Sequence, residues 1–262
     1  VIMKECDLLI ALGTSFTHAF AGENYDQFNP SAKLIMVNTD SSEITKPGLN
    51  VDIALEMDLK EFISILLNDY KIHKVDNNYS EWLKRCNDLK KKLPTVLPSY
   101  AGNPINSYYF VECLNRHSIE NHIFVNDAGS ANYICSQGLK LREGQRELTS
   151  GAFYSMGVAV PYAIGASVTR PESQVIAITG DGSIELNIQE LRTISLNNLN
   201  IKLFVINNGG YASIRKSQDD MVGGRYTDDE EVLNFSKVAD AFELPFHILE
   251  DNIKLDVKIP VI

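Results

Sequence analysis

The sequence predicts an α/β protein built from two open, mostly parallel-sheet, three-layer domains. Short apolar runs alternate along the chain with amphipathic helical segments, and several of these runs end at a glycine or a polar turn. Runs that are apolar on both faces are typical of strands covered by helices on each side of a sheet. The length of 262 residues is about twice that of a usual domain, which agrees with two domains.

The first predicted domain covers residues 1–70. Residues 6–12 (CDLLIAL) and 33–38 (KLIMVN) are expected to be buried parallel strands. Residues 51–69 run from a short strand into an amphipathic helix. The apolar face of that helix carries Leu59, Phe62, Ile63, Leu66 and Leu67. Because the chain starts in a strand-like run without an initiator methionine, we expect further chain upstream.

Residues 71–103 differ in composition from the segments on either side. They are polar, basic in the middle and interrupted by Pro94 and Pro98. We expect a linker that contains one surface helix at about residues 82–93.

The second predicted domain covers residues 104–262 and again alternates strands with helices. Residue 161 is a proline inside the second expected helix, which it should bend. The expected order is a helix over 105–118, a strand and polar loop over 122–130, a helix over 155–169, a strand over 174–180, a helix over 183–196, a strand over 201–207 and a helix over 235–242.

Composition excludes several classes of function. The formal net charge of −10 argues against nucleic acid or an anionic membrane as the main partner, and no apolar run is long enough to span a bilayer. The four cysteines form no close pair, so we expect reduced thiols in a cytoplasmic protein rather than disulfides or a zinc site. The five histidines are scattered and predict no metal site.

Two polar turns follow neighbouring predicted strands. Gly180-Asp181-Gly182 ends one strand and Asn207-Asn208 ends the next, with one helix, one loop and one strand between them. Because ligands bind beyond the carboxyl ends of parallel strands, we expect both turns at one edge of the sheet. An Asp carboxylate, an Asn carbonyl and a main-chain carbonyl are the hard oxygen ligands that suit Mg²⁺.

The residues beside these turns suit an anion. Ser183 is placed to cap a helix that starts at Ile184, and a helix N-terminus offers unpaired N–H groups to a phosphate. Gly182 and Gly210 allow close approach of the backbone. The pattern therefore indicates a metal-bridged diphosphate site, although each turn taken alone is an ordinary structural turn.

Gly-Asp-Gly followed about 25 residues later by Asn-Asn resembles the pattern of thiamine-diphosphate-dependent enzymes. The neighbouring SGAFYSMGVAVPYAIGASV and GDGSIELNIQEL resemble the acetolactate synthase branch. The resemblance covers essentially the whole chain. Residues 1–70 look like the C-terminal part of the central domain of that family, and residues 104–262 look like its thiamine-diphosphate-binding domain.

The resemblance implies a set of site residues. Mg²⁺ would be held by Asp181, the side chain of Asn208 and the carbonyl of Gly210. Met156 corresponds to the apolar residue that bends the cofactor. The carbonyl of Tyr154 corresponds to the acceptor for the amino group of the cofactor's pyrimidine. The family usually has glycine at the position of Tyr154. The residues that would contact the cofactor are Gly129, Ser130, Gly182, Ser183, Gly210 and Tyr211.

The implied activity is decarboxylation of a 2-oxo acid, with pyruvate as the expected donor, followed by carboligation to a second carbonyl. The activating glutamate of the family lies in an N-terminal domain that is absent here, on a partner subunit. We therefore expect half of a longer polypeptide that works as a homodimer or tetramer, with this fragment alone inactive.

Two departures from the acetolactate synthase pattern keep alternatives open. Residues 15–19 (SFTHA) replace the Arg-Phe-Asp-Asp-Arg run of the FAD-binding members, which argues against FAD, and Ser217 stands where those enzymes have tryptophan. Arg215 and Lys216 either meet an anionic acceptor or are surface charges on a loop. The alternatives are a simple decarboxylase, a carboligase that acts on a keto sugar, and a non-catalytic scaffold relative. No Gly-x-Gly-x-x-Gly after a strand supports a Rossmann oxidoreductase.

Overall fold

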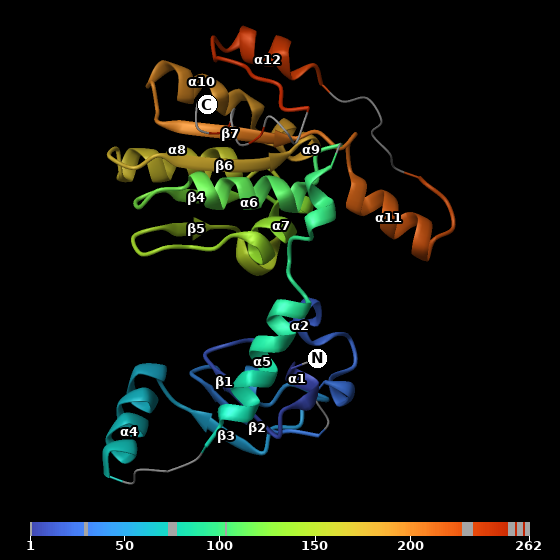
Figure 1. Ribbon diagram of the computed structural model, residues 1–262. Helices are drawn as coiled ribbons and strands as arrows, with labels where there is room; N and C mark the ends of the chain where they lie inside the picture. The colour runs from blue at the N-terminus through green and yellow to red at the C-terminus, as the bar shows by residue number, and fades with distance from the viewer. Residues whose placement is uncertain are drawn as a thin grey trace. The chain divides into compact units, whose positions relative to one another are not determined.

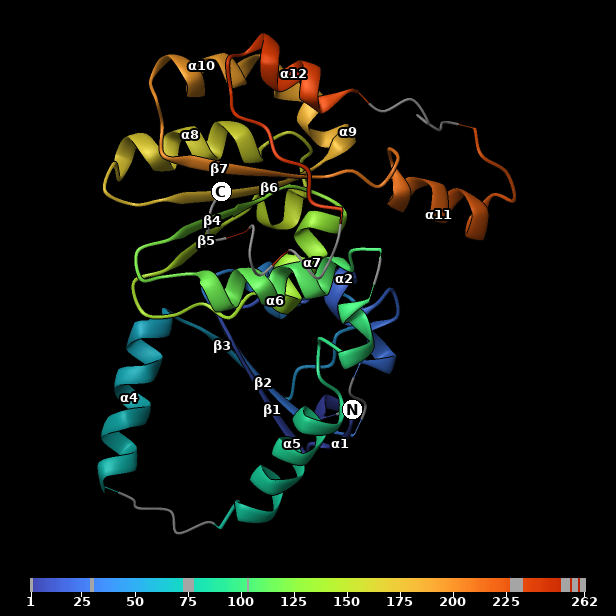
Figure 2. The same ribbon diagram turned by 45° about the horizontal axis from the view of Figure 1, so that its top comes forward.

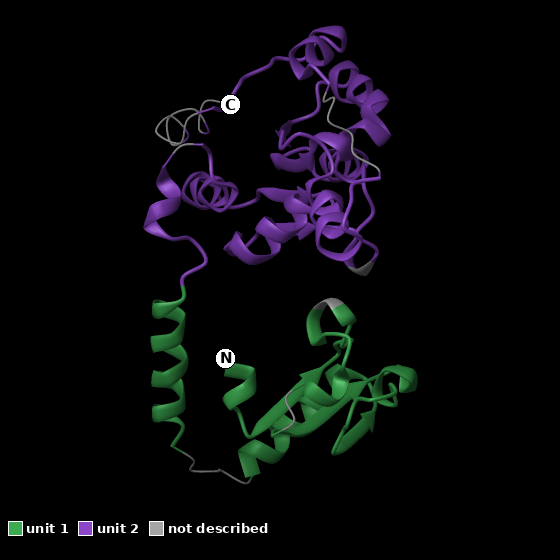
Figure 3. Cartoon of the chain, turned by 90° about the vertical axis from the view of Figure 1, so that its right-hand side faces the viewer, with its two compact units in different colours: residues 1–93 green, residues 94–262 purple. Residues whose placement is uncertain are grey.

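The computed structural model contains two compact units, residues 1–93 and 94–262 (Figure 3). The structure describes residues 2–28, 31–72, 78–102, 104–226 and 233–250, together with residues 255 and 259. Each unit contains one sheet in which all strand pairs are parallel, so the predicted α/β class is confirmed. No helix among the described residues is long and apolar enough to cross a membrane.

The first unit is built on a three-stranded sheet of order β1-β2-β3 (Figure 1). Both strands predicted in residues 1–38 are present. The elements are α1 (Ile2–Glu5), β1 (Leu8–Leu12), α2 (His18–Ala21), η1 (Tyr25–Gln27), β2 (Lys33–Asn38), α3 (Ser41–Ile44), β3 (Ile53–Glu56), α4 (Leu59–Ile72) and α5 (Ser80–Lys92).

The sheet of the first unit packs one face into an apolar cluster, while the other face is partly exposed and buries Val37. Ala11, Leu34 and Met36 lie on the buried face, because alternate residues of a strand point to the same side. Leu8 and Ile10 on the other face are each 46% exposed. The amphipathic helix α4 forms as predicted; Leu59 and Phe62 of its apolar face are half-buried, and none of its residues is fully buried.

Helix α5 forms inside the segment that was predicted as a linker with a surface helix. It lies in the first unit, where the guanidinium of Arg85 donates two hydrogen bonds to the carboxylate of Glu5, at 3.0 and 2.7 Å. This bidentate pair joins α5 to α1, two segments far apart in the sequence.

The second unit is built on a four-stranded sheet of order β5-β4-β6-β7. Every strand predicted in this half is present, and β5 is an additional edge strand. The elements are η2 (Pro98–Ala101), α6 (Ser107–His117), β4 (Ile123–Asn126), α7 (Ser130–Gly138), β5 (Arg146–Leu148), η3 (Gly151–Phe153), α8 (Ala159–Thr169), β6 (Val175–Gly180), α9 (Asp181–Ile184), η4 (Glu185–Glu190), α10 (Leu191–Leu196), β7 (Ile201–Ile206), α11 (Ala212–Met221) and α12 (Phe235–Ala241).

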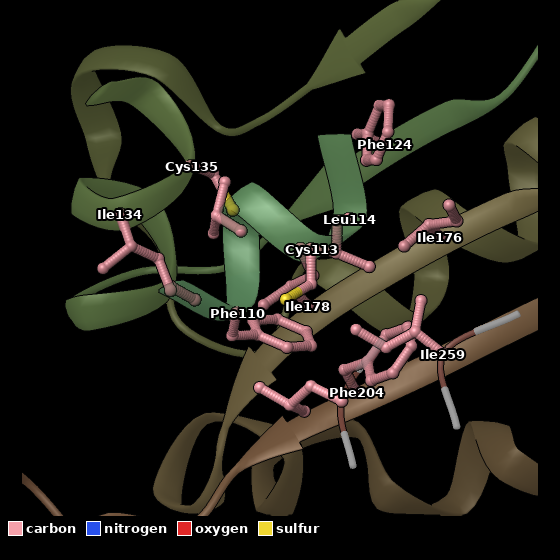
Figure 4. Packing of buried hydrophobic residues seen from close by; sticks show 13 residues of the cluster. Phe110, Cys113, Leu114, Phe124, Ile134, Cys135, Ile176, Ile178, Phe204 and Ile259 are labelled. Atoms are coloured by element: carbon pink, nitrogen blue, oxygen red, sulfur yellow. The ribbon is translucent and has the colours of Figure 1, made fainter. Parts of the chain in front are cut away.

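Helices cover both faces of this second sheet, which makes three layers (Figure 2). Phe124 and Ile178 point toward α6 and α7, in the cluster that Figure 4 shows. Their neighbours Val125 and Ala177 point the other way, toward α8. Both sets are almost completely buried, which explains why the strands read as continuous apolar runs.

The helix predicted over residues 183–196 is divided into α9, η4 and α10. The backbone of Asn187 is non-helical, with φ −138° and ψ 31°, and its side-chain amide donates to the carbonyl of Gly157 at 2.9 Å. The first turn begins at Asp181, so the expectation that Ser183 caps a helix from Ile184 is wrong. Ser183 lies inside that turn instead.

Two further helices differ from expectation. Pro161 is the third residue of α8, in the first turn, where its missing N–H leaves no intrahelical bond unmade, so the helix does not need to bend there. Residues 212–221, considered as a loop from the sequence, form α11.

Candidate functional site

The carboxyl ends of β6 and β7 lie side by side. The two strands pair in parallel with Gly180 opposite Ile206. Asp181 follows β6 and is 2% exposed, and its Oδ2 accepts hydrogen bonds from the backbone N–H groups of Asn208 and Gly210, each at 2.9 Å. The two polar turns that the sequence placed at one edge are therefore joined directly through this carboxylate.

The oxygen atoms at this junction suit a hard cation. Oδ1 of Asp181 accepts one N–H, that of Gly182, and keeps acceptor capacity. The Asn208 side chain is exposed and makes no hydrogen bond among the described residues. The Gly210 carbonyl accepts from the N–H of Ala212 at 2.9 Å and retains a second lone pair. These three oxygens are of the type that Mg²⁺ prefers.

The same junction lacks the multiple charged ligands of a self-sufficient metal centre. Within the described part of the chain, no group of three or more His, Cys, Asp or Glu side chains is placed to hold a metal ion. A cation at this edge would therefore complete its shell with oxygens from a bound ligand, as Mg²⁺ does with phosphates.

Gly182 is required by the close approach of Tyr211. A Cβ at position 182 would lie 2.5 Å from Cε1 of the Tyr211 ring and 3.0 Å from its Cδ1. The ring therefore packs directly on the backbone of the turn that follows β6. Tyr211 follows the Asn-Asn turn, so this contact brings the turn after β7 against Gly182. The glycine was expected from the sequence to allow a close approach at this position.

Asp127, which follows β4, joins three segments through its buried carboxylate. Oδ1 accepts from the N–H of Ala128 at 2.8 Å and of Gly157 at 2.9 Å. Oδ2 accepts from the N–H of Ala159 at 3.1 Å and the hydroxyl of Thr179 at 3.0 Å. The side chain of Asp127 is 1% exposed, so it organises the protein interior.

The Gly129-Ser130 turn lies close to the start of α11. Gly129 has φ +61°, and a Cβ there would lie 3.9 Å from Oγ of Ser213. Ser130 is the first residue of α7. A third loop at the carboxyl edge thus lies near the loops that follow β6 and β7.

Tyr154 and Met156 lie between η3 and α8. Tyr154 has left-handed backbone angles, φ 47° and ψ 38°, and is 44% exposed. Met156 is half-buried and directly precedes Gly157, whose N–H and carbonyl are both held, by Asp127 and Asn187. The left-handed angles give a physical reason why a glycine would suit position 154.

Arg215 has a contact that sequence reasoning missed. Its guanidinium donates to the carbonyl of Gly209, and to that of Asn208 at 3.2 Å, so it holds the turn after β7 from the side of α11. Lys216, in contrast, points to Asp220 at 2.8 Å on the exposed surface of α11. No sequence pattern distinguishes the two cations, because the distinction depends on how α11 folds back.

Comparison with known proteins extends this picture. The family described as "Thiamine pyrophosphate enzyme, C-terminal TPP binding domain" matches residues 127–259, and "Thiamine pyrophosphate enzyme, central domain" matches residues 1–66. The first match covers Asp127, Met156, Asp181 and Asn208.

Several curated relatives are acetolactate synthase large subunits. That of Cyanidium caldarium is 34% identical over 229 residues, which cover 86% of this chain and 38% of the relative. The isozyme 1 large subunit of Escherichia coli (strain K12) is 31% identical over 217 residues, with 83% and 37% covered. The large subunit of Pyropia yezoensis is 32% identical over 245 residues, with 92% and 41% covered. The chain thus spans about two fifths of the length of these relatives.

Proposed function

The chain belongs to the thiamine pyrophosphate enzyme family, and we therefore propose that it uses thiamine diphosphate and Mg²⁺ to decarboxylate a 2-oxo acid, as part of an acetolactate synthase-like enzyme. Carboligation of the product to a second carbonyl would follow. The observation that carries this proposal is the junction of the turns after β6 and β7, where the buried Asp181 carboxylate accepts hydrogen bonds from the backbone of Asn208 and Gly210.

In this proposal the turn after β6 and the turn after β7 hold the metal and the diphosphate together. Asp181 supplies the one charged ligand, and Asn208 and the carbonyl of Gly210 supply neutral ones. Gly182, Ser183 and Tyr211 bind the diphosphate from one side, and Gly129 with Ser130 binds it from the β4 side. The buried position of Asp181 supports this, because its carboxylate is held in place by backbone N–H groups before any cation binds.

Tyr154 and Met156 would position the reactive part of the cofactor. When bound, thiamine diphosphate supplies a nucleophilic carbon and an electron sink that allows CO₂ to leave the 2-oxo acid. The side chain of Met156 would support the bent form of the cofactor, and the carbonyl of Tyr154 would accept a hydrogen bond from its amino group. The bonds from Asp127 and Asn187 to Gly157 support this role, since they restrain the backbone beside Met156.

The whole enzyme would be a homodimer or tetramer whose sites are completed by an N-terminal domain of a partner subunit. We propose pyruvate as the donor. A keto-sugar acceptor is a second candidate, because residue 217 is a serine with an exposed side chain on α11, where acetolactate synthases have a tryptophan. A bulky side chain that would restrict the acceptor is thus missing at this position.

The test is calorimetric titration of the full-length protein with thiamine diphosphate, with Mg²⁺ and with excess EDTA. Asp181→Asn keeps the size of the side chain and removes its charge, so cofactor affinity should fall by about 100-fold or more. Asp240→Asn, on the exposed surface of α12, is the matched control and should leave it unchanged. Equal affinity in Asp181→Asn and wild type would refute the metal assignment.

The second arm measures CO₂ release from a panel of 2-oxo acids and the products formed with added pyruvate or a keto sugar. Release of CO₂ without a coupled product would indicate a simple decarboxylase. Tight cofactor binding without CO₂ release from any acid would favour a scaffold relative.

A further inference from the structure

A pocket of about 210 Å³ lies at the amino edge of the four-stranded sheet, opposite the edge that carries the cofactor loops. His122 directly precedes β4, and Lys202 is the second residue of β7. Both line this pocket, together with His117 at the end of α6. We call it the amino-edge pocket. Because it lies where the strands begin, it is separate from the site proposed for thiamine diphosphate.

The polar part of the described lining brings the Lys202 ammonium and the His122 imidazole to one pocket. None of the described residues that line it has a carboxylate. The backbone of Lys202 takes part in the sheet, whereas its side-chain ammonium makes no ion pair or hydrogen bond with any residue that the structure describes. The imidazole of His122 is only 7% exposed, and its Nδ1 has no hydrogen-bond partner among those residues. Buried polar groups in folded proteins are normally paired, so Nδ1 of His122 lacks, among the described residues, the partner that such a group usually has.

Burial acts on the pKa of both groups, and the charge of Lys202 also acts on that of His122. Burial lowers the pKa of His122, and the nearby Lys202 ammonium lowers it further. Burial also lowers the pKa of Lys202. An anion placed between the two side chains would offset both effects, because it would favour their charged forms.

The rest of the lining includes apolar side chains. Among them are Leu114, Ile176 and Phe204, which belong to the core between α6 and the sheet. A cavity of about 150 Å³ is known to hold benzene, so the amino-edge pocket has room for a molecule of roughly six to eight heavy atoms.

We propose that the amino-edge pocket is a second ligand site, which binds a small carboxylate with a short aliphatic chain. The carboxylate lies between Lys202 and His122, and the chain packs against Phe204 and the other apolar side chains of the lining. A ligand of this site needs both a negative charge and an apolar chain. A free phosphate has the charge but no apolar chain.

The probe is sodium butyrate, titrated into the full-length protein by calorimetry, because butyrate lacks the 2-oxo group that the catalytic reaction requires. Butyramide has the same shape without the charge and should bind at least about tenfold more weakly. From acetate to butyrate, affinity should rise by about fourfold for each methylene buried. Lys202→Met keeps the length of the side chain and should weaken butyrate binding at least about tenfold.

Lys237→Met, on the exposed surface of α12, is the control and should bind butyrate as wild type does. Butyrate should also shift the His122 Cε1–H resonance, assigned by comparison with His122→Gln. Equal binding of butyrate and butyramide, equal binding of inorganic phosphate, unchanged binding in Lys202→Met, or no butyrate binding would each overturn the proposal. If Lys202→Met does not fold, the butyrate and butyramide comparison in the wild-type protein decides.

Discussion

Replacing Gly157 with alanine tests the packing that holds the backbone beside Met156. Gly157 is buried and has φ +80°, an angle that favours glycine. A Cβ there would lie 2.8 Å from Cβ of Leu186 and 3.2 Å from the carbonyl oxygen of Ser183. Neither atom lies at the end of a flexible side chain, so the turn after η3 and the segment after α9 would have to move apart.

The expected cost has two parts. Left-handed backbone angles cost a residue with a Cβ about 1 kcal/mol more than glycine. Overpacking a filled interior costs a further 1–3 kcal/mol or so. Gly157→Ala should therefore lower the free energy of unfolding of the second unit by about 2–4 kcal/mol.

Gly151→Ala is the matched control. Gly151 has φ +59°, but a Cβ at that position meets nothing within 4 Å. This substitution should carry the backbone cost alone, about 1 kcal/mol. The difference between the two variants, about 1–3 kcal/mol, measures the steric contact of Gly157 by itself.

The assay has to separate the two units. The single tryptophan, Trp82, lies in the first unit, so its fluorescence during urea unfolding should be the same in all variants. Amide hydrogen exchange of β6 follows the second unit. If Gly157→Ala and Gly151→Ala destabilise that unit equally, the close packing around Gly157 is refuted.

Three further predictions concern other parts of the second unit. Asp127→Asn should lower the free energy of unfolding by about 2–4 kcal/mol in urea titrations, because buried donors lose a charged acceptor. The exposed control Asp240→Asn should leave it nearly unchanged, and an effect of Asp127→Asn as small as that of the control would contradict the prediction. Tyr154→Gly should be about 1 kcal/mol more stable than Tyr154→Ala, since both remove the side chain and only glycine relieves the left-handed angles; thermal unfolding that does not separate them would refute the strain. Because burial and Lys202 lower the pKa of His122 below its ordinary 6.5, the unfolded chain takes up a proton first as the pH falls. The free energy of unfolding should therefore decrease below about pH 6.5, and His122→Phe should remove that part of the pH dependence; an unchanged profile would exclude His122 as its source.

Local sequence was sufficient for the strands and for the convergence of two turns. Apolar runs predicted β6 and β7 because a strand buried on both faces needs no alternation. Once the strands are parallel, their carboxyl ends must share an edge, so Asp181 and Asn208 were expected to meet. The bond from the Asn208 N–H to the Asp181 carboxylate is the direct result.

Helix boundaries were less predictable because tertiary contacts override local preference. Residues 183–196 have a helical apolar stripe, yet Asn187 leaves helical angles and bonds to Gly157, a residue 30 positions away. The apolar stripe at residues 59–67 correctly predicted the helix α4. Whether that stripe is buried depends on what packs against it.

Composition and periodicity alone determined the α/β class, the order of strands and helices, and the pairing of the two turns at one edge of a sheet. These features can be predicted because they depend on hydrogen-bond geometry and on side-chain direction along the chain. Only the tertiary structure decided that Asp127 faces inward, that Arg215 holds the turn after β7, and that His122 and Lys202 share a pocket. Each of these depends on which distant donors and acceptors reach within about 3 Å, and that distance is set by packing between segments rather than by their order.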